Sequence, residues 1–428
     1  MHKTQFVRTQ MLEPEEPPVS SRGMVGWLHA NLFSNAFNAV LSLLSLAAIY
    51  WILSQVLPWM FSPTWYGTSL ENCREINGPA GGACWGVIRE RWLQLLFGFY
   101  PSELYWRPIA TFLLLAVALA PVLFTSVPRK LMYFTAVYPF LMPWLLWGGS
   151  IWNPIVAAMG FALGYGVYRV IYDHFGNLAA SIGALVAPVL WWLFLAAPAS
   201  SLLQGVIPLG IEPVQSRLFG GFMLSLTIGV VGIALSLPLG ILLALGRQSD
   251  LLIVRSLSVG FIEFIRGVPL ITLLFVASTL LNIFMPPGTN FDIILRVIIM
   301  VTLFAAAYMA EVIRGGLAAL PRGQYEAADA LGLDFWLAQR LVIMPQALKI
   351  SIPGIVSTFI GMFKDTTLVS IIGLLDPLGL LRSIRADANW NGIVWELYGF
   401  VALLFFIACF SMSRYSLYLE RKLRTGHQ

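Results

Sequence analysis

The stretch EAADALGLDFWLAQRLVIMP, residues 326–345, lies between two strongly apolar runs and is too polar for lipid. Glu, Ala and Leu favour a helix over its first six residues, and Gly332 can take the left-handed conformation that ends a helix. Asp334 is placed to cap a second helix that runs to about Met344. Pro345 predicts a kink or a stop there. The stretch therefore predicts a bent helical pair beside a membrane.

The composition of the chain indicates its class. Of 428 residues, 58% are hydrophobic and only 11% are charged, and the mean hydropathy is +0.79. Because a soluble domain carries about 25% charged residues, these values predict an all-α polytopic membrane protein. The pI of about 9.1 then reflects basic loops rather than nucleic-acid binding, since no basic tract is interleaved with aromatic residues. No Walker A pattern is present, so any ATP must be used by another subunit.

About ten transmembrane helices are predicted from apolar runs long enough to cross a bilayer. These runs are 35–61, 109–125, 131–147, 154–171, 178–202, 222–245, 261–283, 293–310, 352–374 and 394–410. Residues 1–30 form a polar tail rather than a signal peptide, because the first apolar run begins late and is long. Residues 31–205 then hold five spans with a polar loop at 62–105. Residues 206–428 hold the other five, with the polar stretch inside a loop at 318–350.

The distribution of Lys and Arg predicts the orientation. With ten spans, both termini share one side of the membrane. That side collects Lys3, Arg8, Arg22, Arg129, Lys130, Arg247, Arg255, Arg314, Arg322, Arg340, Lys349 and the basic C-terminal tail. The opposite side has far fewer basic residues, so both termini and the 318–350 loop are expected in the cytoplasm.

The chain has three cysteines. Cys73 and Cys84 lie in the 62–105 loop, whereas Cys409 lies in a late apolar run. If the loop faces an oxidising compartment, a Cys73–Cys84 disulfide is expected; two unpaired thiols are the alternative. The four histidines are scattered, so no metal site is predicted.

The polar stretch resembles the EAA loop of ABC-importer permeases, in which EAA is followed at fixed spacing by Gly, an aliphatic residue, Leu and Pro. The matching residues are Glu326, Ala327, Ala328, Gly332, Val342 and Pro345, while Met344 replaces the Leu. In that family the loop is the coupling helix, which sits in a cleft on the ATPase subunit. The resemblance implies that role here, with Glu326 either paired to a basic group or simply solvated. The alternative is an ordinary hairpin between spans.

Further motifs follow in the order found in permeases of the polar amino-acid class. They include EFIRGVPL at 263–270, AAYMAEVIRGG at 306–316 and MFKDTTL at 362–368. The resemblance implies a type I ABC-importer permease core in residues 206–428. With its five-span extension, the chain is similar to the long M-type subunit of general L-amino-acid importers, the kind linked to glutamate, glutamine, aspartate and asparagine.

Two groups of ionisable residues lie in or beside apolar runs. Lys364, Asp365, Thr366 and Thr367 lie near the middle of the ninth run, where charges are costly and tend to face a pore or a partner. They are candidates for the substrate pathway, although neighbouring helical residues point about 100° apart and a structural pair is the alternative. Glu311 and Arg314 can pair on one helix face, which favours a structural or gating role. Arg266 matches the family's RGxPL motif and is expected to position the seventh span.

The prediction for the whole chain is a permease subunit of an ATP-driven L-amino-acid importer in the bacterial inner membrane. The resemblance implies a second permease as a heterodimer partner, an ATPase dimer that uses ATP and Mg, and a periplasmic amino-acid-binding protein. No catalytic residues, bound cofactor or nucleic-acid partner are expected in this chain. An ion-coupled secondary transporter acting alone is the alternative.

Overall fold

A computed structural model describes residues 23–61, 64–78, 81–280, 283 and 292–423. The chain divides into two compact units, an N-terminal unit up to Gly86 and a C-terminal unit from Val87.

The described residues of the N-terminal unit form three helices and a short disulfide-linked segment. Its helices are α1 (Gly23–Asn31), α2 (Ala36–Phe61) and α3 (Leu70–Asn77). Helix α2 is apolar along its whole length and buries none of its side chains in the structure. A helix that is apolar on every face is stable only where lipid or other protein covers it.

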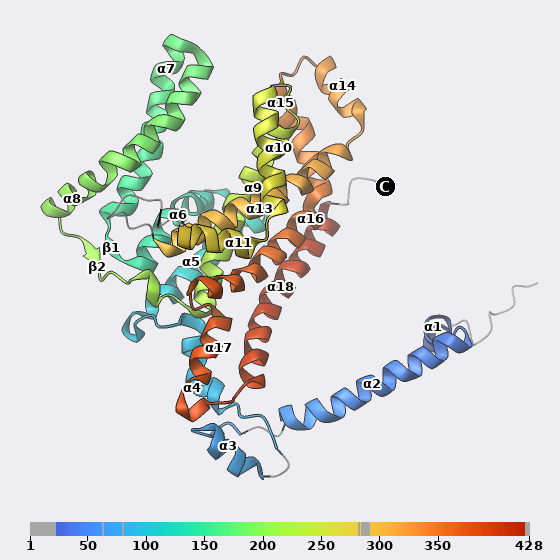
Figure 1. Cartoon of the computed structure of the whole chain (residues 1–428). Helices are drawn as coiled ribbons and strands as arrows, with labels where there is room; N and C mark the ends of the chain where they lie inside the picture. The colour runs from blue at the N-terminus through green and yellow to red at the C-terminus, as the bar shows by residue number, and fades with distance from the viewer. Residues whose placement is uncertain (1–22, 62–63, 79–80, 281–282, 284–291, 424–428) are drawn as a thin grey trace, which may run out of the picture. The chain divides into compact units, whose positions relative to one another are not determined.

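The C-terminal unit is almost entirely helical (Figure 1). Its first elements are α4 (Gly86–Phe97), η3 (Ser102–Leu104), α5 (Trp106–Leu123), η4 (Arg129–Leu131), α6 (Met132–Trp147), α7 (Trp152–Leu190), η5 (Trp191–Leu195), α8 (Ala196–Val206) and η6 (Ser216–Leu218). The later elements are α9 (Gly221–Arg247), α10 (Leu252–Gly267), α11 (Leu270–Phe275), η7 (Val276–Leu280), α13 (Ile293–Ala318), α14 (Arg322–Ala330), α15 (Phe335–Ala338), η8 (Gln339–Ile343), α16 (Met344–Asp365), η9 (Thr366–Ile372), α17 (Pro377–Arg385), η10 (Ala388–Trp390) and α18 (Trp395–Leu423). A two-stranded antiparallel ribbon pairs β1 (Gly149–Ser150) with β2 (Gly210–Ile211).

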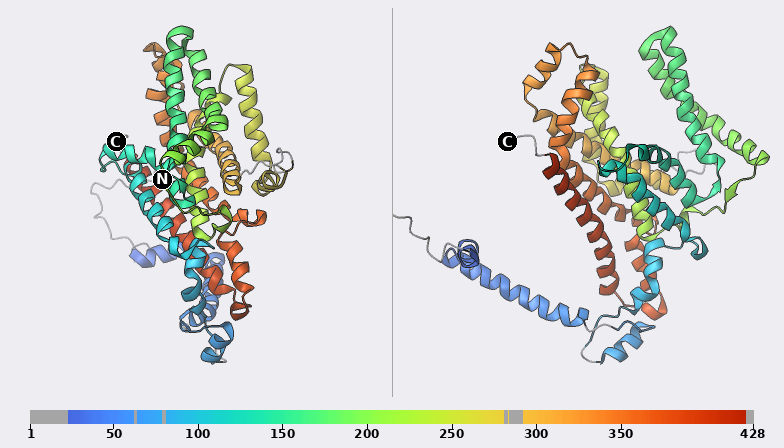
Figure 2. Two further views of the ribbon diagram at one scale, coloured as in Figure 1. Left: turned by 90° about the vertical axis from the view of Figure 1, so that its left-hand side faces the viewer. Right: turned by 180° about the vertical axis from the view of Figure 1, so that it is seen from behind.

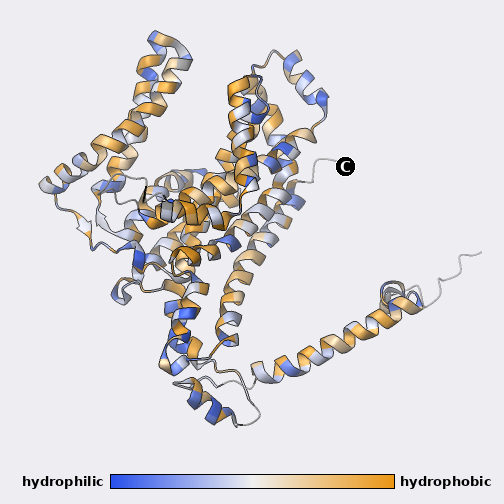
Figure 3. Ribbon diagram, in the orientation of Figure 1, coloured by the Kyte–Doolittle hydropathy of each residue, from blue (hydrophilic) through white to orange (hydrophobic). Residues whose placement is uncertain are grey.

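Small residues allow the central helices to pack closely. Helix α13 packs most extensively on α9 and then on α16. A Cβ atom on Gly240 of α9 would lie 2.6 Å from the Met309 Cβ of α13, so the two backbones approach where glycine leaves room. One buried cluster joins α5 and α6 to α9 and α13, and a second joins α9, α10, α13 and α16. The hydropathy colouring shows these helices as largely apolar and α14 as polar (Figure 3).

Eight helices in the described part of the chain are long and apolar enough to cross a membrane. They are Ala36–Phe61, Ser102–Leu123, Trp152–Asn177, Ala179–Val206, Gly221–Arg247, Ile293–Ala318, Phe335–Ile372 and Trp395–Leu423. Helix α7 holds the third and part of the fourth, because the chain reverses at Gly176, where φ is +77°. Two of the ten predicted runs differ from a full span. The run at 131–147 is the 16-residue helix α6, shorter than the roughly 20 residues that a bilayer requires.

The predicted seventh span is wrong as a single continuous helix. Helix α10 and the segment Leu270–Thr279 meet at an angle of 100°. Pro269 lacks an N–H and disfavours helical geometry at Val268, whose φ and ψ are −110° and 131°. The pair is therefore a broken span, and the charged residue Arg266 lies beside the break.

The segment at 62–105 is also not the plain polar loop that was predicted. It contains α3, most of its second half is the helix α4, and η3 follows. Its polar residues serve as helix caps and turns: Ser69 accepts a hydrogen bond from the Asn72 N–H at 3.1 Å and so caps α3.

Candidate coupling loop and membrane pathway

The loop between α13 and α16 begins with helix α14. Its end is a Schellman turn, in which the Gly332 N–H donates to Asp329 O (2.9 Å) and the Leu333 N–H donates to Ala328 O (3.2 Å). Gly332 has φ +69°, which confirms the predicted left-handed glycine. A Cβ atom at this position would meet no atom within 4 Å, so the backbone angle alone requires glycine.

The second helix begins as predicted but does not end as predicted. The Asp334 carboxylate accepts a hydrogen bond from the Leu337 N–H at 2.9 Å and caps α15. The helix then passes through the π-turn η8 into α16, so the prediction of an end near Met344 is wrong. Pro345 is the second residue of α16, just after the π-turn, and the wider turn accommodates a residue that lacks an N–H.

Five large apolar side chains of the loop are exposed, and we call them the apolar rim. They are Leu331 (75% exposed), Phe335 (56%), Trp336 (66%), Leu337 (42%) and Leu341 (61%). The Phe335 and Trp336 rings pack edge to face with centroids 5.2 Å apart. Single exposed apolar residues are ordinary, but a contiguous group on an otherwise polar segment is typical of a docking surface.

The EAA residues lie on both faces of α14. Glu326 and Ala327 are exposed, whereas Ala328 is buried. The Gln346 side-chain N–H of α16 donates to Gln324 Oε1 of α14 at 2.9 Å and ties α14 to the membrane helix. The loop is thus fixed to the core on one face while the other face remains available.

Glu311 on α13 lies at the centre of a charge cluster. Its carboxylate is 2.6 Å from Arg247 Nη1, 2.9 Å from Arg314 Nη2 and 3.8 Å from Arg266 Nη1. The pair with Arg314 is the one that the i, i+3 spacing predicts. Arg247, at the end of α9, also contacts Glu263 of α10 at 3.0 Å. No local sequence pattern indicates that Arg247 and Glu263 join this cluster, because both lie far from Glu311 along the chain.

The Lys364–Thr367 stretch lies where the helix changes from α to 3₁₀ geometry. The Thr366 hydroxyl donates to Phe363 O (2.7 Å) and the Thr367 hydroxyl donates to Lys364 O (2.9 Å). Both hydroxyls are therefore satisfied by their own helix. Lys364 and Thr367 line a cavity of about 230 Å³, and Asp365 is half-buried. The other lining residues come from α17 and α18: Leu378, Tyr398, Val401, Ala402 and Phe405.

A larger cavity of about 770 Å³ is lined in part by Ser278 and Thr279, which follow the break in the seventh span, and the sequence did not indicate it. Its polar lining includes Ser216, Asp292 and Arg296. Asp292 caps α13 and accepts a hydrogen bond from the Ser216 hydroxyl, which in turn accepts one from Trp147 Nε1 at 2.6 Å. Arg296 Nη1 donates to Ser278 O at 2.8 Å. Within the described residues, no group of His, Cys, Asp and Glu could hold a metal ion.

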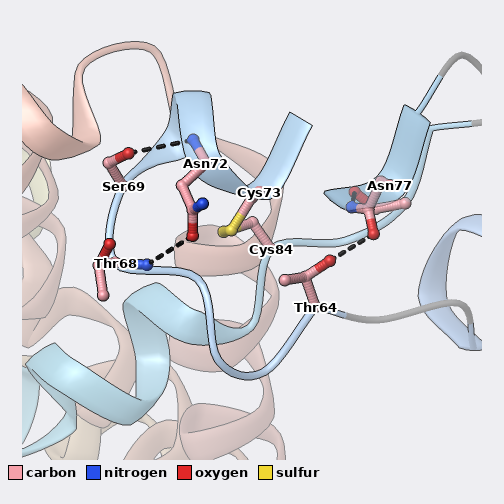
Figure 4. The surroundings of a disulfide bond; sticks show 8 residues. Thr64, Thr68, Ser69, Asn72, Cys73, Asn77 and Cys84 are labelled. Carbon is pink, nitrogen blue, oxygen red and sulfur yellow. Dashed lines mark hydrogen bonds between the residues drawn. A yellow bond between two sulfur atoms is a disulfide. The ribbon is translucent and has the colours of Figure 1, made fainter. Parts of the chain in front are cut away.

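Cys73 and Cys84 form a disulfide in the N-terminal unit, with Cα atoms 5.7 Å apart (Figure 4). Around the bond, the Thr64 hydroxyl donates to Asn77 Oδ1, and Trp85 stacks on Trp65 with ring centroids 6.1 Å apart. Cys409 is a free thiol in α18.

Residues 236–425 match the family of binding-protein-dependent transport system inner membrane components. The chain is also 60% identical, over its whole length and that of its relative, to the glutamate/glutamine/aspartate/asparagine transport system permease protein BztC of Rhodobacter capsulatus. This chain is an amino-acid ABC transporter permease. It is 41% identical, over 95% of both chains, to the inner membrane amino-acid ABC transporter permease protein YhdY of Escherichia coli.

Among solved structures, the crystal structure of an amino acid ABC transporter matches 46% of this permease and 90% of its own chain, with 29% identity and a TM-score of 0.42. The family confirms the predicted class, a multi-span permease subunit of a bacterial amino-acid importer and not an enzyme. The alternative of a secondary transporter acting alone has no support among the relatives. Permeases of this family work with an ATPase and a binding protein.

Proposed function

We propose that this permease imports glutamate, glutamine, aspartate and asparagine. The observation that supports these substrates is the identity of 60% to BztC along the entire chain, including the extension that precedes the permease core. The proposed domain division keeps that extension at residues 31–205, after a tail at 1–30, and the permease domain at 206–428. Helices α5 and α6 of the extension share a buried cluster with α9 and α13, so we propose that they support the core.

The loop between α13 and α16 is proposed to couple the permease to the ATPase dimer, which binds ATP and Mg. The apolar rim and the exposed residues Glu326 and Ala327 provide the docking face, and buried Ala328 anchors α14. Gly332 sets the angle between α14 and α15, and Pro345 follows the π-turn that joins the loop to α16. Exposed aromatic and aliphatic side chains that fill a partner's cleft are typical of binding hot spots.

Lys364 is the residue that we propose for the substrate pathway. It lines a cavity together with aromatic side chains, and an ammonium group can pair with a substrate carboxylate. Asp365 can supply the complementary charge for a substrate ammonium. The hydroxyls of Thr366 and Thr367 are used by the helix backbone, so we assign these two residues to shaping the 3₁₀ turn.

The proposed topology keeps ten crossings, with the short helix α6 and the broken span counted as one each, and follows the distribution of basic residues. Both termini and the coupling loop lie in the cytoplasm, and the Cys73–Cys84 disulfide lies in the oxidising periplasm, where such bonds persist. Within the C-terminal unit, α14 and the reversal of α7 lie at one end and α17 at the opposite end (Figure 2). The amino-acid-binding protein is proposed to dock at the α17 end, and a second, different permease completes the pathway.

The test is amino-acid uptake by the purified assembly in liposomes, with wild type compared with Gly332→Trp. Because φ at Gly332 is +69° and no atom lies within 4 Å, the indole strains the turn and projects into the docking face without disturbing the core. We expect both ATPase binding and ATP-dependent uptake to fall, while the permease stays folded.

Gly205→Trp is the matched control, because Gly205 lies on α8 with no atom within 4 Å of its Cβ position. It should leave both readouts unchanged. Wild-type uptake that persists without ATP, or an effect of Gly205→Trp equal to that of Gly332→Trp, overturns the coupling role of the loop. Competition by each of the four amino acids tests the substrate range.

A further inference from the structure

Three helices of the permease core meet at one carboxylate. Glu311 belongs to α13, Arg247 ends α9, and Arg266 is the second-last residue of α10. The Glu311 side chain is only 16% exposed, and Arg247 contacts it at 2.6 Å. Charged hydrogen bonds in a partly buried site are stronger than exposed ion pairs. The Glu311 carboxylate therefore links α13 firmly to α9.

Arg266 lies directly before the break in the seventh span. The chain turns through 100° between α10 and α11, at Val268 and Pro269. The Arg266 guanidinium lies 3.8 Å from the Glu311 carboxylate and over the Tyr308 ring, 5.6 Å from its centroid. Both partners belong to α13, so α13 holds the first arm of the broken span.

The second arm of the broken span is held by the same helix. Arg296, near the start of α13, donates to the Ser278 carbonyl of η7 at 2.8 Å. The π-turn η7 continues α11, and Ser278 lines the 770 Å³ cavity. Helix α13 therefore contacts the broken span on both sides of its bend, through Arg266 before the bend and Ser278 after it. The Ser278 contact lies at the wall of the cavity.

The other end of α13 leads into the proposed coupling loop. Helix α14 begins only a few residues after α13 ends at Ala318, and Gly316 of α13 lies against Ala347 of α16, where a Cβ atom would be 2.6 Å from the Ala347 carbonyl oxygen. Packing this close transmits a displacement rather than absorbing it.

We infer that Glu311 is a positioning residue that makes α9, α13 and the broken span follow the coupling loop as one body. The inference rests on the proposed coupling role of that loop. A displacement of the loop moves α13, and the arginines held by Glu311 carry the bend of the seventh span and the cavity wall with it. Without the carboxylate, a movement of α13 is no longer transmitted fully to the broken span.

The experiment measures ATP hydrolysis and amino-acid uptake in the same liposomes containing the complete assembly. Glu311→Gln keeps the shape of the side chain but removes the charge. We expect uptake per ATP hydrolysed to fall about tenfold, with ATPase binding retained, since coupling between sites is typically of this size. A purely structural role would lower hydrolysis and uptake together and leave their ratio unchanged.

Arginine variants test whether the ion pairs between helices are required, or only the balance of charge in the cluster. Arg247→Gln and Arg266→Gln break ties to α9 and α10 and should lower the ratio. Arg314→Gln breaks a pair within α13 alone and should leave it near wild type. Glu263→Gln is the matched control for Glu311→Gln. It removes a carboxylate from the same cluster, but this carboxylate pairs with Arg247 of α9 and not with a residue of α13.

The ratio of uptake to ATP hydrolysis in these variants either supports the positioning role of Glu311 or overturns it. Equal effects of the three arginine variants, or a wild-type ratio in Glu311→Gln, overturn the inference while leaving the proposed function intact. Absence of ATP-dependent uptake in the wild type overturns the proposed function instead. If Glu311→Gln fails to fold, the comparison of Arg266→Gln with Arg314→Gln, at side chains that are 35% and 44% exposed, still tests the inference.

Discussion

Two helical excursions leave the permease core at opposite ends and share one local design (Figures 1 and 2). One is the coupling loop between α13 and α16. The other, which we call the return segment, runs from Gly373 to Trp390 between η9 and α18. Each uses a left-handed glycine, Gly332 with φ +69° and Gly373 with φ +87°. Each then caps a helix with an aspartate, Asp334 in the loop and Asp376 in the return segment.

The burial of the apolar side chains separates the two. The large side chains of the return segment are covered by their own chain, with Leu380, Leu381 and Trp390 at 0% exposure. Those of the apolar rim are 42% to 75% exposed. Local sequence therefore specifies the turn in both places, but only tertiary packing decides whether the apolar residues stabilise the fold or await a partner.

The largest expected effect is on folding, from Trp390→Ala. A fully buried aromatic residue replaced by alanine typically costs about 3–5 kcal/mol, because burial is lost and a cavity remains. We expect a clear loss of thermal stability in the purified permease, measured by fluorescence-detected unfolding. Trp336→Ala, at an exposed tryptophan, should leave the unfolding temperature unchanged. Equal losses in the two variants contradict the comparison.

The second effect concerns the two capping aspartates and pH. Burial raises the pKa of Asp376 to about 6, although the Gly379 and Leu378 N–H groups and Arg382 favour its charged form. In the unfolded chain the pKa is about 3.9. Below pH 4 the carboxyl is protonated in both states. Between pH 4 and 6 the unfolded state releases its proton first, so the stability from this group is lost as pH rises.

A difference of about two pKa units corresponds to roughly 2–3 kcal/mol at pH 7. We expect Asp376→Asn, which retains a capping oxygen, to remove this loss when unfolding is followed from pH 4 to 7. Asp334→Asn, at the exposed cap, controls for the replacement of a capping carboxylate. The explanation by burial fails if the wild type and Asp376→Asn show the same pH profile.

The same contrast explains which features could be predicted from sequence. Gly332 and Asp334 were predicted because their conformations follow from neighbours a few residues away. The pair of Glu311 with Arg314 was predicted for the same reason, whereas Arg247 reaches Glu311 from another helix. Such a contact depends on how the helices pack, and no local pattern indicates it.

Proline was the least predictable residue. Pro269 was assigned to a continuous span but breaks it. Pro345 was expected to kink or end the second helix of the loop, but it lies in a helix that continues from a π-turn. Both residues lack the backbone N–H that a regular helix uses. Whether the chain bends or widens a turn depends on the surrounding packing, which the sequence does not display.

The third effect is on docking. If the apolar rim fills a cleft on the ATPase, Trp336→Ala should weaken binding of the ATPase by about thirtyfold, which is about 2 kcal/mol and typical of an aromatic hot spot. Binding can be measured by titrating labelled ATPase onto the permease pair in nanodiscs. Trp395→Ala is the matched control, since Trp395 is 73% exposed on α18, away from the loop. If ATPase binding weakens in both variants, or in neither, the apolar rim is not part of the docking face.

The smallest effect tests the shared design of the two excursions. Gly332→Ala forces a side chain into the left-handed region, at a cost of about 1–2 kcal/mol. Because the loop is exposed, the cost should appear as local opening, with amide hydrogen exchange of the α14–α15 turn rising about fivefold or more and the unfolding temperature nearly unchanged. Gly323→Ala, within helix α14 and also without neighbours, should slow exchange instead, since alanine favours a helix.

Gly373→Ala introduces the same backbone strain in the return segment. Opening there exposes buried leucines, so the substitution should lower the unfolding temperature. Strain that stays local at Gly332 and becomes global at Gly373 is what distinguishes a docking loop from a packed one.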